Sequence, residues 1–493
     1  MGINTKILKQ LISEWQGSRS LYNMKAGERY YNAKHDILKK KLNEYTIFDL
    51  QTNMQVKKIN ENKSNEKIAH PFHQKHVNQK VRYCCSKPIT IRYNPLKEDK
   101  EKEKEIVDKI WNCLGYRFEK NLKNDAKNAS NKGRTWIHPE YENGKLVFKR
   151  YDAKELIPIY DTECESELKG MIHIYPIQDL SNTEPKTKLY VEYWDSKEVV
   201  YYEEQETSDG SVFVEDVTKP RSGCHFTTTV YDATLNNILR VEKHSWDKVP
   251  FIEVENNEER TTDLEPIKNL IDAYDLIDSN FVNTVEDLKE IIWLVNGYGA
   301  EDLLSYIEAI KVNGVARTND ANGKIEAKTI EIPYEARKTL LEMLRSLIYE
   351  FGNAVDTNNK ELIGKAPSGV SLEFLYSDLD QKADDLISGL KVAIYEMIEY
   401  VLKDLEFQGQ LSNIDAFDFS IEFNKTKIFN EIEKVNTINN DTTMSLKSKL
   451  EKHPWIDDVQ AELEQLKKEK AEAIKQQKEI FGTNGYNSEL GDE

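Results

Sequence analysis

Three long segments of the chain repeat apolar residues at every third or fourth position, the spacing of a helix with one buried face. They cover residues 261–291, 334–355 and 371–407. The third would form a rod of roughly 50 Å at 1.5 Å per residue. A capping-box pattern at Thr262 predicts that the first helix starts there, and Gly389 is where we expect the third to bend.

Residues 87–254 show a different pattern. Short runs of β-branched and aromatic residues, such as MIHIYPI and KLYVEYW, alternate with turn-forming segments such as YENGK. One helical insert, roughly residues 101–129, interrupts these runs. The first 45 residues show helical patterns, and the Lys/Asn-rich stretch 55–70 is typical of an exposed loop. Residues 1–260 are therefore predicted to form an α+β domain with a mostly antiparallel sheet.

A compact insert at residues 292–333 separates the first two helical segments. Two strand-like runs flank a short helix expected near Glu301, and NDANGK is a hairpin signal. Catalytic groups normally converge in a pocket, so a small α/β module on two helical rods suits a stalk with a tip better than an enzyme core.

The polar segment 356–370, DTNNKELIGKAPSGV, is predicted to be a mobile loop between two long helices. A phosphate-binding loop needs GxxxxGK[ST] after a buried strand, whereas here Lys365 follows the first glycine and no lysine follows Gly369. A mechanical role is favoured, with Gly364 and Gly369 supplying conformational freedom and Lys360 and Lys365 supplying charge.

The remaining C-terminal part divides into three segments. FDFSIEFN predicts a return strand within residues 408–425, and residues 426–470 are helical and charged with a break at LEKHPWIDDVQAEL. Residues 471–493 are expected to end this polar helix and to continue as a disordered tail.

The composition is that of a soluble globular protein, with 39% hydrophobic and 31% charged residues. No apolar run approaches the roughly 18 residues of a membrane span, and no signal peptide is visible. The net charge of −18 hides an asymmetry, because residues 1–100 carry +11 (20 Lys+Arg, 9 Asp+Glu) and the remainder −29 (48 Lys+Arg, 77 Asp+Glu). An acidic surface repels phosphate and argues against tight nonspecific binding of DNA by the whole chain.

The sequence predicts neither an enzyme nor a cofactor. Five scattered cysteines form no disulfide framework and favour a reducing compartment. His70, His73 and His76 match no zinc signature, so surface or packed histidines are favoured and no metal site is expected. We find no Ser/His/Asp or Cys/His arrangement and no Walker element, although clustered carboxylates leave a metal-dependent nuclease as an alternative.

The order of sheet domain, helix, α/β insert, helix, loop and very long helix resembles the portal proteins of tailed phages and prophages of Gram-positive bacteria. The local matches are ERYYNAKHDILKK, VPFIEVENNEERTTDLEPIKNLIDAYDLIDSN and FDFSIEFNKTKIFNEIEK, and the resemblance covers about residues 15–470. This chain has Asn32 and Ala33 where the family usually has a glycine, and Lys427 and Ile428 where it favours a proline. Both departures affect local turns.

The resemblance implies a dodecameric ring at one capsid vertex, through which double-stranded DNA is packaged and ejected. By position, residues 1–260 with 408–425 correspond to the wing, 261–291 and 334–355 to the stem, 292–333 to the clip, 356–370 to the tunnel loop before the long helix 371–407, and 426–470 to the crown.

The resemblance also implies sites and partners. The tunnel-loop residues expected to contact DNA are Lys360, Gly364, Lys365, Pro367 and Gly369. The clip residues expected to bind adaptors are Trp293, Tyr298, Glu301, Asp302, Arg317 and Asn322. The implied partners are the terminase large subunit, a head-completion adaptor, the major capsid protein and scaffolding proteins. No membrane is implied, and the expected location is the virion, with assembly in the host cytoplasm.

A helical scaffold or adaptor unrelated to DNA is the alternative of a different class, because long amphipathic helices suit it equally. Ring formation separates this alternative from a portal, and metal-dependent DNA cleavage would favour a nuclease.

Overall fold

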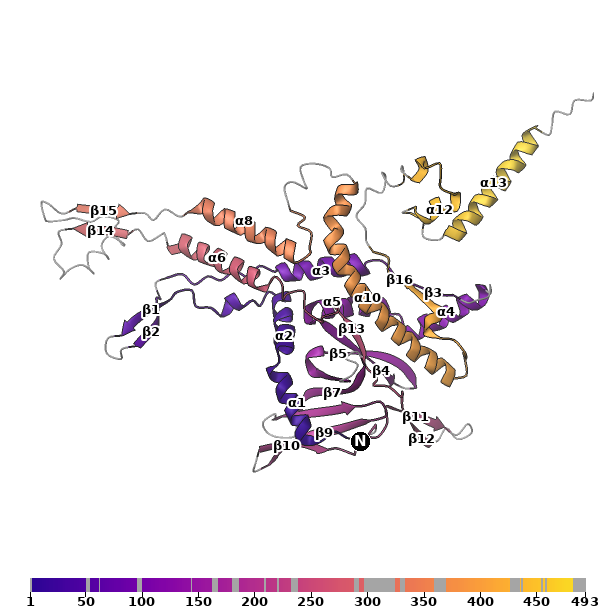
Figure 1. Ribbon diagram of the computed structural model, residues 1–493, viewed down its shortest axis with the longest axis horizontal. Coiled ribbons are helices and arrows are strands. Elements are labelled where there is room, and N and C mark those ends of the chain that lie inside the picture. Colours follow the sequence, from indigo (N-terminus) through magenta and orange to yellow (C-terminus); the bar gives the residue numbers. More distant parts are fainter. Residues whose placement is uncertain are drawn as a thin grey trace, which may run out of the picture. The chain divides into compact units, whose positions relative to one another are not determined.

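A computed structural model shows an α+β protein in which the named strand pairs are all antiparallel (Figure 1). Unit 1 comprises Met1–Asp356 with Asp378–Thr426, and unit 2 comprises Thr357–Ser377 with Lys427–Glu493. The residues that the structure describes are 2–49, 54–61, 63–94, 100–142, 144–161, 167–179, 186–207, 210–219, 221–231, 238–287, 292–296, 324–328, 333–358, 369–425, 435, 438–453, 455–456 and 459–481.

The largest sheet of unit 1 has five antiparallel strands in the order β10-β9-β8-β7-β6. Alternate residues of β9 enter two different cores, Val199 and Tyr201 on one face and Val200 and Tyr202 on the other. Because both faces are covered at this point, β9 begins with four apolar residues in succession, VVYY. The bounds are β6 (Leu156–Tyr160), β7 (Leu168–Asp179), β8 (Lys186–Trp194), β9 (Val199–Thr207) and β10 (Gly210–Glu215).

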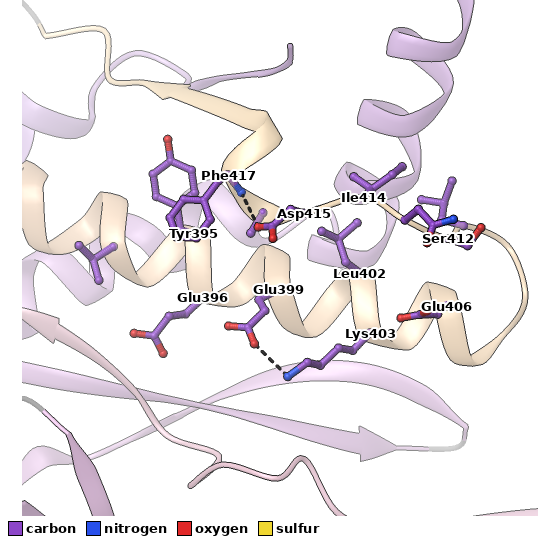
Figure 2. A pocket seen from close by; sticks show the side chains of 14 residues that line it. Tyr395, Glu396, Glu399, Leu402, Lys403, Glu406, Ser412, Ile414, Asp415 and Phe417 are labelled. Carbon is purple, nitrogen blue, oxygen red and sulfur yellow. Dashed lines mark hydrogen bonds and ion pairs between the residues drawn. The ribbon is translucent and has the colours of Figure 1, made fainter. Parts of the chain in front are cut away.

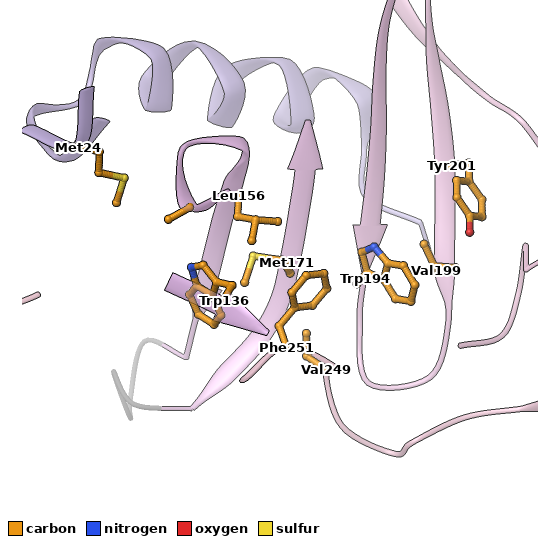
Figure 3. Packing of buried hydrophobic residues seen from close by; sticks show 10 residues of the cluster. Met24, Trp136, Leu156, Met171, Trp194, Val199, Tyr201, Val249 and Phe251 are labelled. Atoms are coloured by element: carbon orange, nitrogen blue, oxygen red, sulfur yellow. The ribbon is translucent and has the colours of Figure 1, made fainter. Parts of the chain in front are cut away.

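Large aromatic side chains fill the core on one face of this sheet. Trp136, Trp194 and Phe251 meet Met171 of β7 there (Figure 3), and both tryptophans are only 1% exposed. On the other face, helix α1 (Thr5–Gly17) inserts its two buried residues, Leu8 and Ile12. The sheet is thus held between a helix and an aromatic cluster.

Smaller sheets complete the antiparallel arrangement. The strand β4 runs through RTWIHPEYE, which was not among the strand-like runs identified in the sequence. Its partner β13 pairs only with Arg134–Ile137, so Pro139 has a ladder partner on one side alone. The sheets are β13 (Ile252–Glu255) with β4 (Arg134–Glu142) and β5 (Lys145–Tyr151), β11 (Phe226–Tyr231) with β12 (Ile238–His244), and β3 (Thr90–Tyr93) with β16 (Phe419–Glu422).

Two predictions for the first 132 residues were wrong. The insert expected as one helix is two, α4 (Lys100–Leu114) and α5 (Phe118–Lys132), separated by a turn at Gly115 with φ of +79°. The stretch 55–70 is not a loop throughout, since β2 (Met54–Ile59) forms a hairpin with β1 (Glu44–Asp49). Helices α2 (Arg19–Tyr31) and α3 (Phe72–Cys85) flank this region in sequence, and 3-10 turns lie at Asp36–Lys39, Ala153–Glu155 and Ala416–Asp418.

Helices α6 (Lys268–Asp287) and α8 (Tyr334–Phe351) lie side by side (Figure 1), with the rings of Phe281 and Tyr334 6.2 Å apart. The start of α6 differs from the prediction at Thr262. The Thr262 N–H does donate to Glu265, at 2.9 Å, but the buried Thr262 hydroxyl accepts no hydrogen bond in return, and residues 263–267 form turns.

The two strand-like runs of the insert form an antiparallel pair, β14 (Ile292–Asn296) with β15 (Lys324–Lys328). The helix expected near Glu301 and the NDANGK turn lie outside the described residues.

The longest helix, α10 (Gly369–Phe407), begins two residues earlier than expected and keeps its apolar stripe buried from Leu379 to Leu405. Gly389 lies where this helix crosses the end of β13. A Cβ at Gly389 would stand 2.5 Å from the carbonyl oxygen of Glu255 and 3.2 Å from its nitrogen. The glycine is therefore required by close backbone packing.

Unit 2 contains the helices α12 (Leu446–Glu451) and α13 (Val459–Phe481), which leave the expected break between them. The Ser445 hydroxyl accepts a hydrogen bond from the Ser448 N–H at 3.2 Å and so caps α12. Residues 482–493, predicted to be a disordered tail, lie outside the described part of the chain.

We expect Gly389→Ala to destabilise unit 1 by about 1–3 kcal/mol, because the added methyl must push rigid backbone apart. Helix propensity alone would make the alanine variant about 1 kcal/mol more stable than the glycine protein. A loss of stability would therefore point to the close packing. Thermal unfolding followed by circular dichroism measures it. Gly17→Ala is the control, since nothing lies within 4 Å of its Cβ position. A Gly389→Ala protein as stable as the control variant would contradict the close packing.

Candidate functional site

Most of the predicted site residues lie outside the described residues. This applies to Lys360, Gly364, Lys365 and Pro367 of the loop and to Tyr298, Glu301, Asp302, Arg317 and Asn322 of the insert. Gly369 is the first residue of α10, and Trp293 is the second residue of β14, so neither lies in a loop.

The most extensive polar arrangement that the structure describes joins α6 to the extended segment 64–70, which we call the strap. Every second backbone N–H of the strap donates to a side-chain oxygen on every fourth residue of α6. The four bonds, which form the polar ladder, run from Ser64 to Asp287 (2.9 Å), Glu66 to Asn283 (2.7 Å), Ile68 to Ser279 (3.0 Å) and His70 to Asp275 (2.9 Å). The amide of Asn283 also returns a bond to the Glu66 carbonyl at 3.0 Å.

The spacing of the acceptors along α6 and the spacing of the donors along the strap are nearly equal. Four helical residues rise about 6.0 Å, and two residues of extended chain span about 6.6 Å, so the bonds stay in register over three repeats. The strap therefore needs no neighbouring strand to satisfy the backbone donors that face α6. This also explains why the buried face of α6 is polar at Asp275, Ser279 and Asn283.

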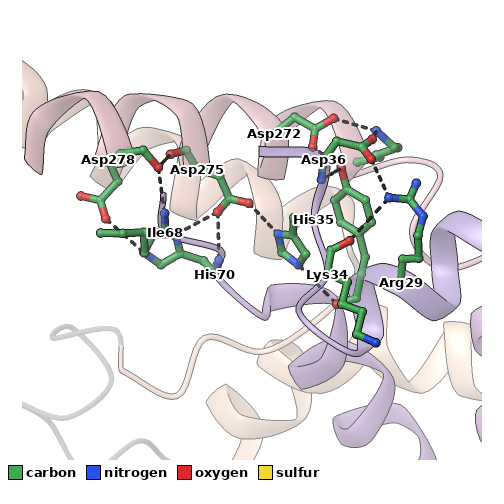
Figure 4. A network of polar contacts seen from close by, with 12 residues as sticks. Arg29, Lys34, His35, Asp36, Ile68, His70, Asp272, Asp275 and Asp278 are labelled. Atoms are coloured by element: carbon green, nitrogen blue, oxygen red, sulfur yellow. Dashed lines mark hydrogen bonds and ion pairs between the residues drawn. The ribbon is translucent and has the colours of Figure 1, made fainter. Parts of the chain in front are cut away.

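Asp275 is the buried end of the polar ladder (Figure 4). Its carboxylate accepts from His35 Nδ1 at 2.6 Å and from His70 Nδ1 at 2.9 Å, and the second His70 nitrogen lies 3.2 Å from Asp278. Burial alone would raise the pKa of Asp275, but the hydrogen bonds from His35 and His70 outweigh it and hold that pKa below its usual range. Two segments distant in sequence are thus fixed to one helix position.

A second attachment to α6 lies one turn nearer its start. Lys268 Nζ stands 2.9 Å from Asp36 and 2.7 Å from Asp272, and Asp36 also pairs with Arg29 at 2.6 Å (Figure 4). Tyr30 donates to Asp272 as well. The chain that follows α2 is therefore bound to α6 by charges as well as by His35.

A buried charge cluster joins four elements of unit 1. Asp263, just before α6, lies 2.7 Å from Lys80 of α3 and 3.5 Å from Lys382 of α10. Lys382 also donates to the carbonyl of Gly352, at the end of α8, at 2.9 Å. Burial would raise the pKa of Asp263, but Lys382 and Lys80 outweigh it and hold that pKa well below its usual range. Asn256 completes the cluster by bonding both Lys80 and Asp263.

His73 and His76 of α3 lie beside this cluster and are fully buried. Burial lowers the pKa of His73 to about 4, against the opposing pull of Asp263, and burial with the nearby Lys382 lowers that of His76 to about 3. Both rings are therefore neutral near pH 7. They are packed histidines, one of the two interpretations, surface or packed, that the sequence left open.

A groove of about 630 Å³ runs between α10 and the segment 411–417 (Figure 2). Leu402 and Tyr395 contribute apolar surface, and Glu399 is paired with Lys403 at 2.9 Å and with Lys248 at 2.7 Å. Burial raises the pKa of Glu396 to about 7. The groove combines apolar and acidic groups, but it lacks a nucleophile with an adjacent base.

Nowhere in the described part of the chain do three or more His, Cys, Asp or Glu side chains gather as a metal ion would require. Among the described helices, none combines the length and the apolar character that crossing a bilayer demands.

Comparison with known proteins decides the family. The family model described as phage portal protein, SPP1 Gp6-like, matches residues 10–476. The chain belongs to this family of phage portal proteins. Two curated relatives agree with the assignment. The portal protein of Clostridium phage phiCD119 is 28% identical over 92% of this chain and 93% of its own length. The portal protein of Bacillus phage SPP1 is 25% identical over 99% of this chain and 90% of its own length.

Membership explains the structural character of the site. Phage portal proteins are structural components of the virion, and the family implies an oligomeric ring in the phage capsid. The resemblance to phage portals noted in the sequence is thereby confirmed.

The polar ladder was not predicted from the sequence, although the residues of α6 that form it follow a regular spacing. Asp275, Ser279, Asn283 and Asp287 recur at every fourth position of the first helical segment, beside the apolar stripe. Such residues normally mark a solvated face. Only the extended strap on the other side shows that the face is buried.

The buried histidines predict loss of stability in acid. Because their folded pKa values lie below the ordinary 6.5, the stability is complete above pH 6.5 and is lost as the pH falls toward 4. Each histidine should add a slope of up to about 1.4 kcal/mol per pH unit in this window. Denaturant unfolding between pH 7 and 4.5 measures the slope, and His76→Leu should reduce it. His453→Leu, in unit 2, is the control, and an unchanged slope in His76→Leu would contradict the assignment.

Proposed function

We propose that twelve copies of this chain close into a ring at one vertex of a phage capsid and form the channel through which double-stranded DNA is packaged and ejected. The observation that carries this proposal is the family match over residues 10–476. The paired helices α6 and α8, which end in the β14–β15 sheet, support a stem that carries a clip.

The proposed clip and crown assign surfaces to partners. The terminase large subunit and later a head-completion adaptor would dock on the clip, at residues 292–333, with Trp293, Tyr298, Glu301, Asp302, Arg317 and Asn322 as the contact residues. The major capsid and scaffolding proteins would surround the ring during assembly in the host cytoplasm. The motor's ATPase would belong to the terminase, since the sequence has no Walker element.

In this proposal the segment 356–370 is the tunnel loop, and it follows the end of α8 and leads into α10. Lys360 and Lys365 would contact phosphates as point charges, with Gly364 and Pro367 setting the backbone of the loop and Gly369 standing at its junction with α10. Each phosphate that a basic residue neutralises adds affinity for DNA through counterion release. A channel with many basic residues would therefore hold DNA in place, whereas a few lysines in an acidic channel would let it slide. The net charge of −29 on residues 101–493 is consistent with a channel through which DNA slides.

Negative-stain electron microscopy with mass photometry tests the ring. We expect closed rings with a central hole at about twelve subunit masses. A compact monomer that cleaves DNA with a divalent metal would overturn the proposal in favour of a nuclease. Assemblies that have no central hole and do not bind DNA would favour a helical scaffold.

The loop lysine has its own test. Lys365→Ala should form normal rings but lower the amount of DNA packaged in vitro by roughly threefold or more, because a ring would lose twelve phosphate contacts. Lys365→Arg keeps the charge and should package nearly normally. Lys145→Ala removes an exposed lysine at the start of β5 and serves as the control. Normal packaging by Lys365→Ala rings would refute the DNA contact.

A further inference from the structure

Basic side chains gather on α3 and α5 of unit 1, in a chain whose net charge is −18. Residues 67–97, which include α3, contain seven Lys+Arg and no Asp or Glu. On α5, Lys120, Lys123 and Lys127 recur at three- and four-residue spacing and so share one face of the helix. Lys120 and Lys123 are exposed, and Lys127 is half-buried.

Two contacts show that this face of α5 borders α3, against which α5 packs. Lys127 Nζ lies 5.3 Å from the centre of the Tyr31 ring, and the Tyr31 hydroxyl donates to Asn78 of α3 at 2.8 Å. Nearer the start of α5, burial raises the pKa of the Cys85 thiol and the charge of Lys123 opposes that rise. Lys123 therefore lies close to the end of α3.

Arg82 extends the positive charge onto α3, where it is exposed in the last turn. We define the basic patch as Arg82, Lys120, Lys123 and Lys127. In the described part of the chain, none of the four forms an ion pair with a carboxylate. Helix α3 has no acidic residue, and of the two on α5, Glu119 is exposed while Asp125 is buried and paired with Arg150. The patch therefore carries positive charge that its own helices leave largely uncompensated.

We propose that the basic patch binds the phosphate backbone of double-stranded DNA, as a second contact besides the tunnel loop. The inference rests on the proposed function, in which the chain handles such DNA. An acidic chain repels DNA as a whole, so any contact has to be confined to a local basic surface of this kind.

The spacing of the lysines fits that ligand. From Lys120 to Lys127 the helix rises about 10.5 Å. Over that length one strand of duplex DNA presents about three phosphates. The buried residues Phe118, Leu122 and Ala126 fix α5 against unit 1, so the three charges keep this spacing.

The composition of the patch favours DNA over an acidic protein. A protein interface has an apolar centre surrounded by a polar rim. The exposed side chains of α5 are instead all polar, namely Glu119, Lys120, Lys123 and Asn124. Lysine, arginine and asparagine side chains are common ligands of DNA phosphates.

The first test measures binding of a fluorescein-labelled DNA duplex by fluorescence anisotropy at several salt concentrations. All proteins carry Lys360→Ala and Lys365→Ala, which removes the lysines of the tunnel loop. The further changes Lys120→Gln, Lys123→Gln and Lys127→Gln together should weaken binding at low salt about tenfold or more. The slope of log affinity against log salt should become shallower by about 2–3, because three phosphate contacts are lost.

The control variant removes three exposed lysines of α13 by Lys467→Gln, Lys468→Gln and Lys470→Gln, which changes the net charge equally. It should bind DNA as the parent protein does. Equal losses in the two variants would show a general effect of net charge and overturn the patch, as would unchanged binding by the patch variant. Both variants should unfold near the parent's temperature, which circular dichroism checks.

The patch and the ring fail separately, because binding is measured on monomers as well as on rings. A loss of DNA binding confined to the patch variant supports the patch even if no rings form, an outcome that would refute the proposed function. Rings of the parent protein that do not bind DNA would overturn the patch and leave the ring intact. Poly-glutamate bound as tightly as DNA would assign the patch to an acidic protein and overturn the DNA contact.

The second test locates the contact by acetylating lysines with a water-soluble ester and identifying them by mass spectrometry. Bound duplex should slow the acetylation of Lys120 and Lys123 and leave that of the exposed Lys145 unchanged. Equal acetylation of Lys120 and Lys123 with and without DNA would overturn the assignment.

Discussion

The Asp263 carboxylate, buried between Lys80 and Lys382, is the interaction on which the arrangement of unit 1 depends. Burying charges costs several kcal/mol for each ion, and only the mutual attraction and the bonds from Asn256 offset that cost. The partners come from α3, from the entry to α6 and from α10, and Lys382 also bonds the end of α8. The entry to α6 and the end of α8 are therefore anchored at one point.

Away from this anchor, side-chain hydrogen bonds bind the outer half of α6 to the strap, while Phe281 packs against Tyr334 of α8. The polar ladder fixes the strap, and the strap in turn bonds, through Asn65, to Leu42 at the base of the hairpin that precedes it in the sequence. Polar contacts of this kind hold position precisely while contributing only about 1 kcal/mol each. A ring-forming portal protein benefits from such positioning, because an error in one subunit is repeated around the ring.

Sequence reasoning was accurate where one periodicity governed a long segment. The stripe Leu379–Leu405 and the run MIHIYPI were both identified, because burial on one helix face or on both sheet faces leaves an unmistakable pattern. It failed where a distant contact decided the outcome. Part of the Lys/Asn-rich stretch is a strap and not an exposed loop, because α6 supplies hydrogen-bond partners that local propensity cannot reveal.

By itself the sequence determined the α+β class, the three long helices, the charge asymmetry and the family, because these follow from periodicity, composition and motifs along the chain. Only the tertiary structure decided which polar residues are buried. Asp263, Asp275 and His76 look like ordinary surface residues in the sequence, and their neutral or paired states depend on groups up to 300 residues away. Burial and pairing are properties of three-dimensional contacts, and no local pattern encodes them.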